Sequence, residues 1–405
     1  MPADFEELAK VSARLRTRFD ASSPPTIGAL IDYLLSEALL NSVLEGTAIT
    51  GPLLDSPAMS ATPESLATFP LPELTTWSDV ASWLSISDKE LAWFSDCRSL
   101  QAKVTERKLH HYNYFWVPKR SGSLRLIEAP KPRLKEIQRK ILKEILNRVP
   151  PHSCAHGFSR GRSTRSYAEP HVGRDAVLRL DLKDFFHSIP LPRIGALYRR
   201  IGYPKNVAWL LQGLCTTSAS PSLAGEEFED LSWAIRKRLE SKHLAQGAPT
   251  SAQLANLCAY RLDCRLEGLA KKFGLNYTRY ADDMAFSGER GLARMSGFIE
   301  ALVGAIAIDE GFLLNHRKTR LRLGSQRQCL GGVIVNDKPN CRRADWDRLK
   351  AILHNCGKHG PESQNTDEHP NFQAHLRGRI AYMSWLNPKR GEKLRQLWDR
   401  IDWDS

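Results

Sequence analysis

The sequence lacks the features that mark disulfide-rich, zinc-binding or membrane proteins. Its eight cysteines include no CxxC pair and have irregular spacing, so we expect neither a disulfide framework nor a zinc cage. We interpret them as small apolar residues in a reducing compartment. The longest apolar stretch near the N-terminus, residues 27–44, contains Asp32 and Glu37, which excludes a membrane span there. We expect no signal peptide before it. The sequence therefore predicts a cytoplasmic protein with no membrane partner.

The two signs of charge are unevenly distributed along the 405 residues. Residues 1–100 hold 6 basic and 14 acidic residues, whereas residues 101–405 hold 52 and 31, a net charge of +21. Lysine and arginine gain affinity for nucleic acids by releasing the counterions of phosphate groups. The basic part therefore favours a polyanionic partner over a merely solvated surface.

Strands and helices are expected to alternate in the first half of the chain. The first 75 residues predict helices at 5–19 and 27–44, followed by an irregular linker rich in Pro, Ser and Thr. Residues 78–93 read as two short helices. Two strands joined by a turn are predicted at 112–129. An apolar stripe then predicts a helix over residues 134–146.

The second half has the same mixed character. A buried strand is expected at 176–181. Thr250 and Gln253 have the spacing of a capping box, and the apolar stripe that follows predicts one helix as far as Phe273. Residues 276–287 read as two short strands around a turn, and the part after residue 342 is mainly helical. Because no βαβ glycine fingerprint is present, we expect an α+β fold with an antiparallel sheet.

Three acidic residues carry the chemistry that the sequence suggests. Asp181 ends a predicted buried strand, and Asp282 and Asp283 occupy the tip of a predicted strand–turn–strand unit. Carboxylates converging from two neighbouring strands could hold two Mg²⁺ ions about 4 Å apart. Alone, the Tyr-x-Asp-Asp pattern is weak, and a solvated acidic turn is the better interpretation.

The order of four motifs along the chain favours a functional interpretation of this pattern. Asp181-Leu-Lys-Asp-Phe-Phe186 is followed by Gln246-Gly-Ala-Pro-Thr-Ser251, then by Tyr280-Ala-Asp-Asp283, then by Asn315-His-Arg-Lys-Thr. This set resembles the palm of a reverse transcriptase over about residues 77–400. The resemblance implies an RNA-directed DNA polymerase with a right-hand fold: fingers, a palm with an antiparallel sheet, a helical thumb, and here also a helical N-terminal extension.

The resemblance also implies domain boundaries. We expect an acidic extension and linker at 1–75, helices and fingers at 76–175, the palm at 176–335 with fingers interleaved, and the thumb at 336–405.

Two groups of site residues follow from the resemblance. Asp181, Asp282, Asp283 and the backbone carbonyl of Leu182 match the ligands of two Mg²⁺ ions, and Lys318 matches the catalytic lysine that acts on pyrophosphate. Phe186 falls where the family places an aromatic ring that blocks a ribose 2′-OH, so dNTPs are the expected substrates. The full set of nucleotide-binding residues implied in this way is Lys119, Arg120, Arg125, Asp184, Phe185, Phe186, Gln246 and Gly247.

Individually, these residues have simpler interpretations. Each of the cations on the predicted strand pair is as compatible with an ordinary surface charge. Asp184 is equally suited to cap the helix after its strand. The histidine pairs His110/His111 and His152/His156 lack the spacing of zinc ligands. The segment His156-Gly-Phe-Ser-Arg-Gly-Arg-Ser163 is expected to form a loop near the template, with its arginines on phosphates.

Further segments are similar to the bacterial retron subfamily, particularly its myxobacterial-type members. They are Ser325–Asn336 and His375–Tyr382. The subfamily's Val-Thr-Gly signature falls at Cys329-Leu-Gly331, where only the glycine agrees. Its Asn-Ala-x-x-His signature is approximated by Asn206-Val-Ala-Trp209.

Membership in that subfamily implies specific partners. They are a cognate structured non-coding RNA, the DNA made from it, dNTPs, host RNase H and an effector or toxin protein encoded nearby. DNA synthesis would start from the 2′-OH of an internal guanosine and give branched RNA–DNA, multicopy single-stranded DNA, in anti-phage defence. The alternatives are a group II intron-like or abortive-infection reverse transcriptase, or a non-catalytic RNA-binding protein on the same scaffold.

Overall fold

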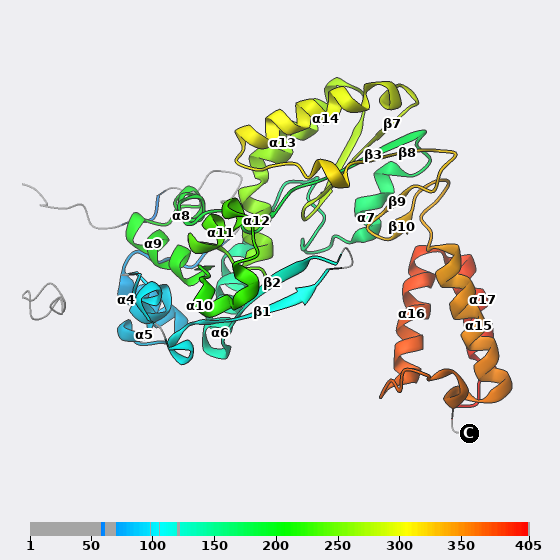
Figure 1. The fold of residues 1–405 in the computed structure, drawn as a ribbon, viewed down its shortest axis with the longest axis horizontal. Coiled ribbons are helices and arrows are strands. Elements are labelled where there is room, and N and C mark those ends of the chain that lie inside the picture. The colour runs from blue at the N-terminus through cyan, green and yellow to red at the C-terminus, as the bar shows by residue number, and fades with distance from the viewer. Residues whose placement is uncertain (1–57, 61–69, 98, 105, 120–121, 404–405) are drawn as a thin grey trace, which may run out of the picture. The chain divides into compact units, whose positions relative to one another are not determined.

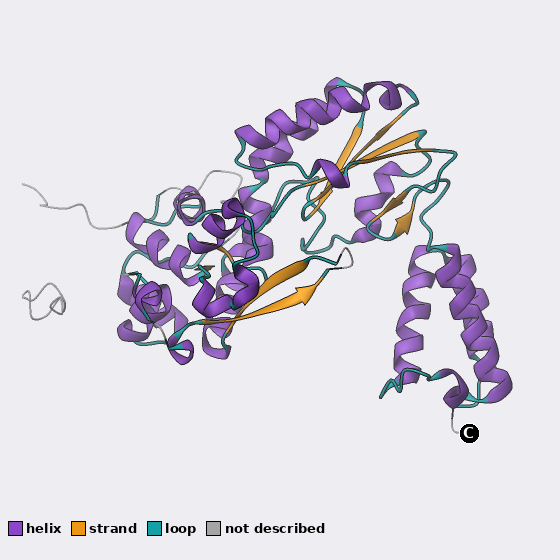
Figure 2. Ribbon diagram, viewed as in Figure 1, coloured by secondary structure: helices purple, strands orange, loops and turns teal. Residues whose placement is uncertain are grey.

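A computed structural model describes residues 58–60, 70–97, 99–104, 106–119 and 122–403. The helices predicted at 5–19 and 27–44 lie outside the described residues, as do most of the predicted N-terminal extension and Arg120. The described part matches the α+β expectation, with many helices and short antiparallel sheets (Figure 1, Figure 2).

The first described helices and strands match their predicted positions. Two short helices, α4 (Trp77–Leu84) and α5 (Asp88–Ser95), precede a two-stranded antiparallel hairpin. Its strands are β1 (Tyr112–Pro118) and β2 (Leu124–Pro130). The amphipathic helix α6 (Pro132–Glu144) follows and buries its apolar face. The predicted hairpin and helices in this region are confirmed.

A four-stranded sheet with the order β6-β7-β3-β8 forms the centre of the fold. The strands are β3 (Ala176–Asp181), β6 (Asn276–Tyr280), β7 (Asp283–Gly288) and β8 (Arg320–Leu323), and every neighbouring pair is antiparallel. Because β3 lies between strands from much later in the sequence, residues about a hundred positions apart meet at one end of the sheet.

The single helix predicted after residue 250 is instead two helices, α12 (Ser251–Cys258) and α13 (Tyr260–Lys272). The predicted capping box is also wrong. Thr250 has helical backbone angles and makes no capping hydrogen bond. The Gln253 amide instead donates to the carbonyl of Leu146, at 3.2 Å, beyond the end of α6. A tertiary contact that satisfies a free carbonyl has therefore replaced the local cap.

The remaining helices and strands surround this centre. Between β3 and α12 lie α8 (Leu191–Arg200), α9 (Lys205–Leu214), β4 (Thr216–Thr217), α10 (Pro221–Ala224), α11 (Trp233–Glu240) and β5 (His243–Leu244). Helix α7 (Thr164–Ala168) precedes β3, and the strands β9 (Cys329–Leu330) and β10 (Val333–Ile334) follow β8. The C-terminal helices are α15 (Arg343–His359), α16 (Phe372–Leu386) and α17 (Pro388–Trp398), as the mainly helical prediction requires.

Buried apolar residues form one large cluster, a second that includes the C-terminal helices, and a smaller third around Phe228. None of the eight cysteines, all within the described residues, forms a disulfide, and five are buried. Cys264 is exposed, so it departs from the prediction that the cysteines serve as core residues.

Helix α14 (Gly291–Asp309) is long and apolar enough, by length and composition, to cross a membrane. One such helix is weak evidence, since core helices of soluble proteins meet the same criteria. Its buried residues, including Ile299 and Val303, join the large core cluster, while Phe298 and Ile308 are exposed. The absence of a membrane partner therefore stays a prediction.

Candidate active site

The three predicted catalytic carboxylates meet at one edge of the central sheet. Asp181, the last residue of β3, is paired in register with Asp283, the first residue of β7. Asp282 lies in the turn before β7, and its carbonyl accepts a hydrogen bond from the N–H of Leu182 at 2.8 Å. Residues from motifs a hundred positions apart thus form one acidic centre.

Like charges directly opposite each other destabilise a sheet, and each carboxylate of this pair has its own cation. Lys318 Nζ lies 3.0 Å from both oxygens of Asp181. Arg179 Nε lies 2.6 Å from Oδ1 of Asp283. Burial still raises the pKa of Asp283 to about 6 against the effect of Arg179. Burial, together with the charge of Asp181, also raises the pKa of Asp282. Burial therefore makes the ionised forms of Asp282 and Asp283 less favourable than they are in water.

The loop at residues 156–163, which the sequence predicts to lie near the template, contacts the turn that carries Asp282 and Asp283. Ala281 adopts a left-handed backbone, with φ of 56°. A Cβ atom at Gly157 would lie 2.6 Å from the amide nitrogen of Ala281, so only glycine fits there. The N–H of His156 donates to the carbonyl of Arg279 at 2.8 Å. The loop is therefore part of the support of the active centre.

A buried polar network that the sequence analysis missed completes this support. Arg279 is fully buried in β6, and its Nε and Nη2 lie 2.8 and 2.6 Å from the carboxylate of Asp263 on α13. Its Nη1 donates to the carbonyl of Ala281 at 2.9 Å and to Asn256 Oδ1 at 3.1 Å. An arginine within a short buried strand was the available signal, since a buried charge requires a partner.

Asp184, Phe185 and Phe186, which follow β3, differ in their burial and in the side chains that they contact. Asp184 has a left-handed backbone, with φ of 50°, and lies 3.5 Å from Arg238 Nη1. Phe186 is half-buried, and its ring lies 6.5 Å from that of the exposed Phe158. Phe185 is 5% exposed and packs inside the palm, where the Arg279 guanidinium lies 5.5 Å over its ring. Phe185 is therefore a buried residue that packs against Arg279 beneath the catalytic turn.

The finger hairpin brings positive charge toward the same centre. Lys119 follows β1 and Arg125 lies on β2. Burial, followed by the charge of Arg125, lowers the pKa of Lys119, while Asp184 and Asp181 act in the opposite direction. The charge of Lys119 therefore interacts with the charges of Asp184 and Asp181.

The predicted nucleotide loop at Gln246 and Gly247 lies against β2. Gly247 has φ of 138°, and a Cβ there would lie 3.1 Å from the carbonyl oxygen of Glu128. The N–H of Gln246 donates to the Glu128 carboxylate at 3.2 Å. The glycine is therefore required both by its backbone angle and by the close approach of β2.

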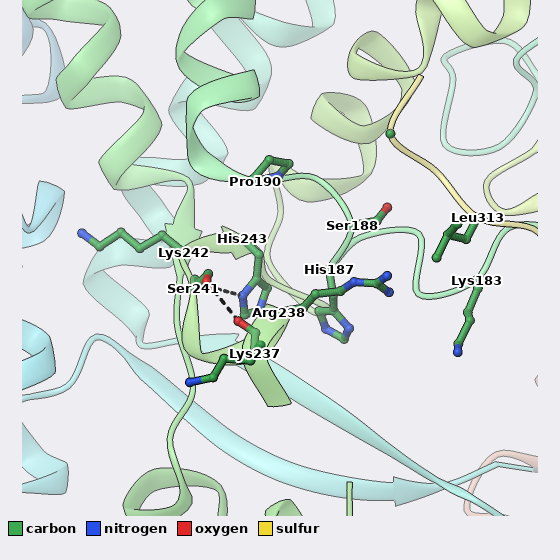
Figure 3. Close-up of a pocket in the computed structure, with 11 residues that line it drawn as sticks. Lys183, His187, Ser188, Pro190, Lys237, Arg238, Ser241, Lys242, His243 and Leu313 are labelled. Carbon is green, nitrogen blue, oxygen red and sulfur yellow. Dashed lines mark hydrogen bonds between the residues drawn. The ribbon is translucent and has the colours of Figure 1, made fainter. Parts of the chain in front are cut away.

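A pocket is formed by the segment after β3 together with the end of α11 and β5 (Figure 3). It is lined by Lys183, His187, Ser188, Pro190, Lys237, Arg238, Ser241, Lys242, His243, Gly311 and Leu313. Three of its cations already have acidic partners: Lys242 with Asp96, Lys237 with Glu240 and Arg238 with Asp184. Much of the positive charge of the lining is therefore neutralised by the protein itself.

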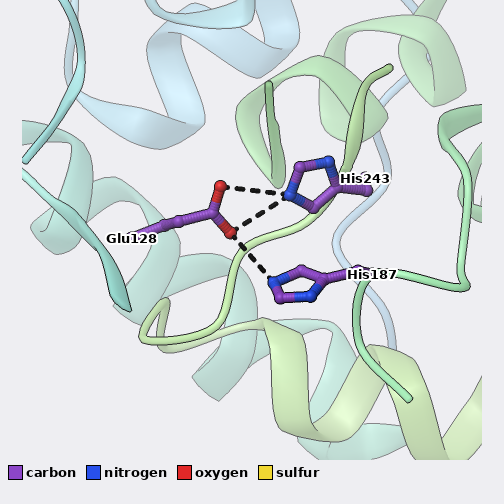
Figure 4. Close-up of side chains that lie close together, drawn as sticks. All are labelled: Glu128, His187 and His243. Atoms are coloured by element: carbon purple, nitrogen blue, oxygen red, sulfur yellow. Dashed lines mark hydrogen bonds and ion pairs between the residues drawn. The ribbon is translucent and has the colours of Figure 1, made fainter. Parts of the chain in front are cut away.

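One group of three potential metal ligands occurs among the described residues: Glu128, His187 and His243, whose ligand atoms lie within 4.8 Å of one another (Figure 4). The sequence analysis did not identify these residues. They come from β2, from the segment after Phe186, and from β5, so no local spacing connects them.

Comparison with known proteins identifies the fold and the chemistry. Residues 117–342 match the family model described as reverse transcriptase (RNA-dependent DNA polymerase). The chain belongs to the reverse transcriptase family. The match includes the three aspartates and the loop at Gln246, and it confirms the expected right-hand polymerase class and RNA-directed DNA polymerase activity.

The relatives of this reverse transcriptase are retron enzymes. It is 40% identical over 329 residues to retron Mx65 reverse transcriptase of Myxococcus xanthus, covering 81% of this chain and 72% of that protein. It is 34% identical over 345 residues to retron Mx162 reverse transcriptase of the same species, covering 79% and 66%. It is also 28% identical to retron Ec86 reverse transcriptase of Escherichia coli, covering 70% and 79%. The predicted kinship with myxobacterial retron reverse transcriptases is confirmed.

Solved structures of other polymerases resemble this reverse transcriptase distantly. Telomerase from Candida albicans, in complex with a fragment of telomeric RNA, has a TM-score of 0.38 and 12% identity, covering 72% of this chain and 61% of that one. A foamy viral protease-reverse transcriptase in complex with double-stranded DNA has a TM-score of 0.34 and 14% identity, covering 74% and 46%.

Proposed function

We propose that this retron polymerase copies part of a cognate structured non-coding RNA into single-stranded DNA at the centre formed by Asp181, Asp282 and Asp283. The observation that carries this proposal is the convergence of the three carboxylates at one sheet edge. Their excess negative charge suits hard divalent cations, and carboxylate and carbonyl oxygens are the ligands that Mg²⁺ takes. Reverse transcriptases generally use divalent metal ions.

The three carboxylates and the Leu182 carbonyl would hold two Mg²⁺ ions. Such ions activate the attacking hydroxyl and stabilise the charge on the departing pyrophosphate. The side chain of Lys318 is 58% exposed beside Asp181, which suits it to donate a proton or hydrogen bond to pyrophosphate. Lys119, Arg120 and Arg125 would bind the triphosphate, because cations of the finger hairpin complement its oxygens.

Other residues of the proposed nucleotide site would select the sugar of the incoming nucleotide. The ring of Phe186 would occupy the space that a ribose 2′-OH needs, and the backbone at Gln246 and Gly247 would contact the nucleotide. Asp184 would shape the same pocket from the turn after β3. Deoxynucleotides are then the substrates.

Priming from the 2′-OH of an internal guanosine would give branched RNA–DNA. The support for this step is the identity of the relatives, which are retron reverse transcriptases. Multicopy single-stranded DNA made in this way would serve anti-phage defence, together with an effector or toxin protein encoded nearby and with host RNase H.

Primer extension tests the polymerase itself. Purified protein with Mg²⁺, dNTPs and a primed RNA template should extend the primer, and the double variant Asp282→Asn/Asp283→Asn should not. Asp337→Asn, a change of an exposed aspartate, is the matched control and should keep activity. Absence of extension by the wild-type enzyme would contradict the proposal.

Nucleic acid that co-purifies with the enzyme from its host tests branched priming. It is run on a denaturing gel with and without RNase A and a debranching enzyme. Single-stranded DNA that shortens with either treatment, and that is missing from the double aspartate variant, supports priming from a 2′-OH. DNA attached to protein would instead favour an abortive-infection type of enzyme, and DNA unaffected by both treatments would exclude the branch.

A further inference from the structure

The carboxylate of Glu128 lies buried between two histidines. Its side chain is fully buried on β2. Nε2 of His243 is 3.1 Å from each carboxylate oxygen, and Nε2 of His187 is 3.5 Å from Oε2 (Figure 4). The three residues come from three separate segments, so this contact is a junction between them.

Glu128 contacts segments that carry residues of the proposed nucleotide site. Glu128 is on the same strand as Arg125, and His187 directly follows Phe186. The third contact is to the nucleotide loop, where the Glu128 carboxylate accepts the N–H of Gln246 and the Glu128 N–H donates to the Gln246 carbonyl at 3.0 Å. Glu128 therefore connects the finger strand, the sugar-selecting turn and the nucleotide loop.

The hydrogen bonds of His243 define its protonation. Nδ1 lies 2.7 Å from the carbonyl oxygen of Ser241, which can only accept. Nε2 faces the carboxylate of Glu128, which accepts in its ionised form. Both ring nitrogens must therefore donate, and the side chain is an imidazolium. Burial lowers the pKa of His243, but the carboxylate of Glu128 and the backbone hydrogen bonds together raise it above its usual value.

The two histidines stabilise the ionised carboxylate of Glu128. Burial alone would raise the pKa of Glu128, but His243 and His187 lower it to about 2. Other ionisable groups surround the pair: Tyr112 and Tyr114 on β1, and the pocket cations Lys183, Lys237, Arg238 and Lys242. Glu128 and His243 therefore form a buried ion pair, and His243 and His187 also line the pocket.

We propose that Glu128 and His243 are positioning residues for the incoming nucleotide, which act by holding the Gln246–Gly247 loop against β2. The proposal rests on the proposed role of that loop. Neither side chain would touch the substrate. Removing one partner would leave a buried group without its counterpart, so the loop would lose a fixed position and the enzyme would lose nucleotide affinity.

Steady-state primer extension tests this with Glu128→Gln, His243→Gln and the double variant, and with Glu136→Gln on the exposed face of α6 as control. We expect KM for dNTP to rise about tenfold in each single variant while kcat changes much less, the pattern of lost binding. Because the two side chains act as a unit, the double variant should be no worse than one single variant.

The wild-type enzyme provides a second test that needs no substitution. A raised pKa in the folded protein means that the ion pair is intact at lower pH and is lost as pH rises through the pKa of His243. KM for dNTP should therefore increase on the alkaline side, and His243→Gln should flatten this increase. NMR of the ¹⁵N-labelled histidines should show both His243 nitrogens protonated at neutral pH.

The results of these experiments distinguish the proposed polymerase mechanism from the proposed positioning role of Glu128 and His243. Extension by the wild type that needs Asp282 and Asp283 supports the polymerase mechanism whatever the variants do. Unchanged KM in Glu128→Gln and His243→Gln, or additive effects in the double variant, would overturn the positioning role alone. The same three side chains are also a ligand set for Zn²⁺. Zinc found in the purified wild type and missing from Glu128→Gln would overturn the proton-held ion pair.

Discussion

Arg279 and Asp263 form a buried ion pair in which two guanidinium nitrogens each donate to one carboxylate oxygen, and neither side chain is exposed to solvent. The pair joins β6 to α13 directly behind the turn that carries Asp282 and Asp283. Because Arg279 also donates to the carbonyl of Ala281, the ion pair fixes the position of the catalytic turn as well as the packing of the helix on the sheet.

Arg279→Met should destabilise the protein by about 3–5 kcal/mol, since it leaves the Asp263 carboxylate buried without a partner. Urea unfolding measures this loss. Lys271→Met, which removes an exposed ion pair with Glu267, is the control and should have a much smaller effect, because solvent screens exposed pairs. Equal effects of the two substitutions would contradict a supporting role for the buried pair.

Gly157→Ala should reduce activity more than stability. The added Cβ would lie 2.6 Å from the Ala281 amide nitrogen, so the aspartate turn would have to shift. A displacement of this kind near reacting groups lowers kcat by about 10²-fold. Single-turnover extension is the measurement. Gly268→Ala on α13 meets no atom within 4 Å and should instead stabilise the helix by about 0.5–1 kcal/mol with normal activity.

Phe186→Ala should admit ribonucleotides, because the ring that would exclude a 2′-OH is removed. We expect the ratio of kcat/KM for dNTP over rNTP to fall at least about tenfold, as for other steric changes in a binding pocket. Phe158→Ala removes the neighbouring ring and should keep the preference for dNTP. Unchanged selectivity in Phe186→Ala would remove this residue from sugar selection.

Acid should destabilise the fold through His171. Nε2 of this buried histidine lies 2.7 Å from the Thr278 hydroxyl, which itself donates to a carbonyl, and Nδ1 lies 2.6 Å from the Ser287 hydroxyl. A serine hydroxyl can donate to Nδ1, so both contacts suit a neutral ring. Burial lowers the pKa of His171 to about 3. The unfolded chain therefore takes up this proton first, and the free energy of unfolding should fall by about 2 kcal/mol from pH 6.5 to pH 5 through this residue.

His171→Gln should show a smaller fall over the same pH range in urea unfolding, because the amide keeps a donor and an acceptor but does not titrate. His354→Gln, on the exposed face of α15, should retain the wild-type pH dependence. An unchanged slope in His171→Gln would mean that this residue carries no charge change on unfolding.

The sequence predicted those parts of the structure that depend on neighbouring residues. The hairpin at 112–129 and the strands around Asp282 have local signals in apolar alternation and turn residues, and the structure contains both. At the start of helix α12, a tertiary contact of Gln253 replaces the expected cap at Thr250. The burial of Phe185 also depends on residues distant in sequence.

The junction at Glu128 could not be predicted for the same reason. Glu128 and His243 are 115 residues apart, and each alone reads as an ordinary polar residue in its segment. Only the folded chain shows that one carboxylate connects the three segments around the pocket. A single sequence contains the catalytic motifs, but it does not show which distant residues hold them in place.

The central position of β3 has a consequence for the synthesis of the protein. Both of its neighbours, β7 and β8, lie about a hundred or more residues later in the chain. At roughly 5–20 residues per second, a ribosome needs about 5–20 seconds to add a hundred residues. During that time, the apolar strand that ends in Asp181 has no partner in the sheet. The nascent chain thus holds an unpaired strand, and no complete catalytic centre, until most of the palm has been translated.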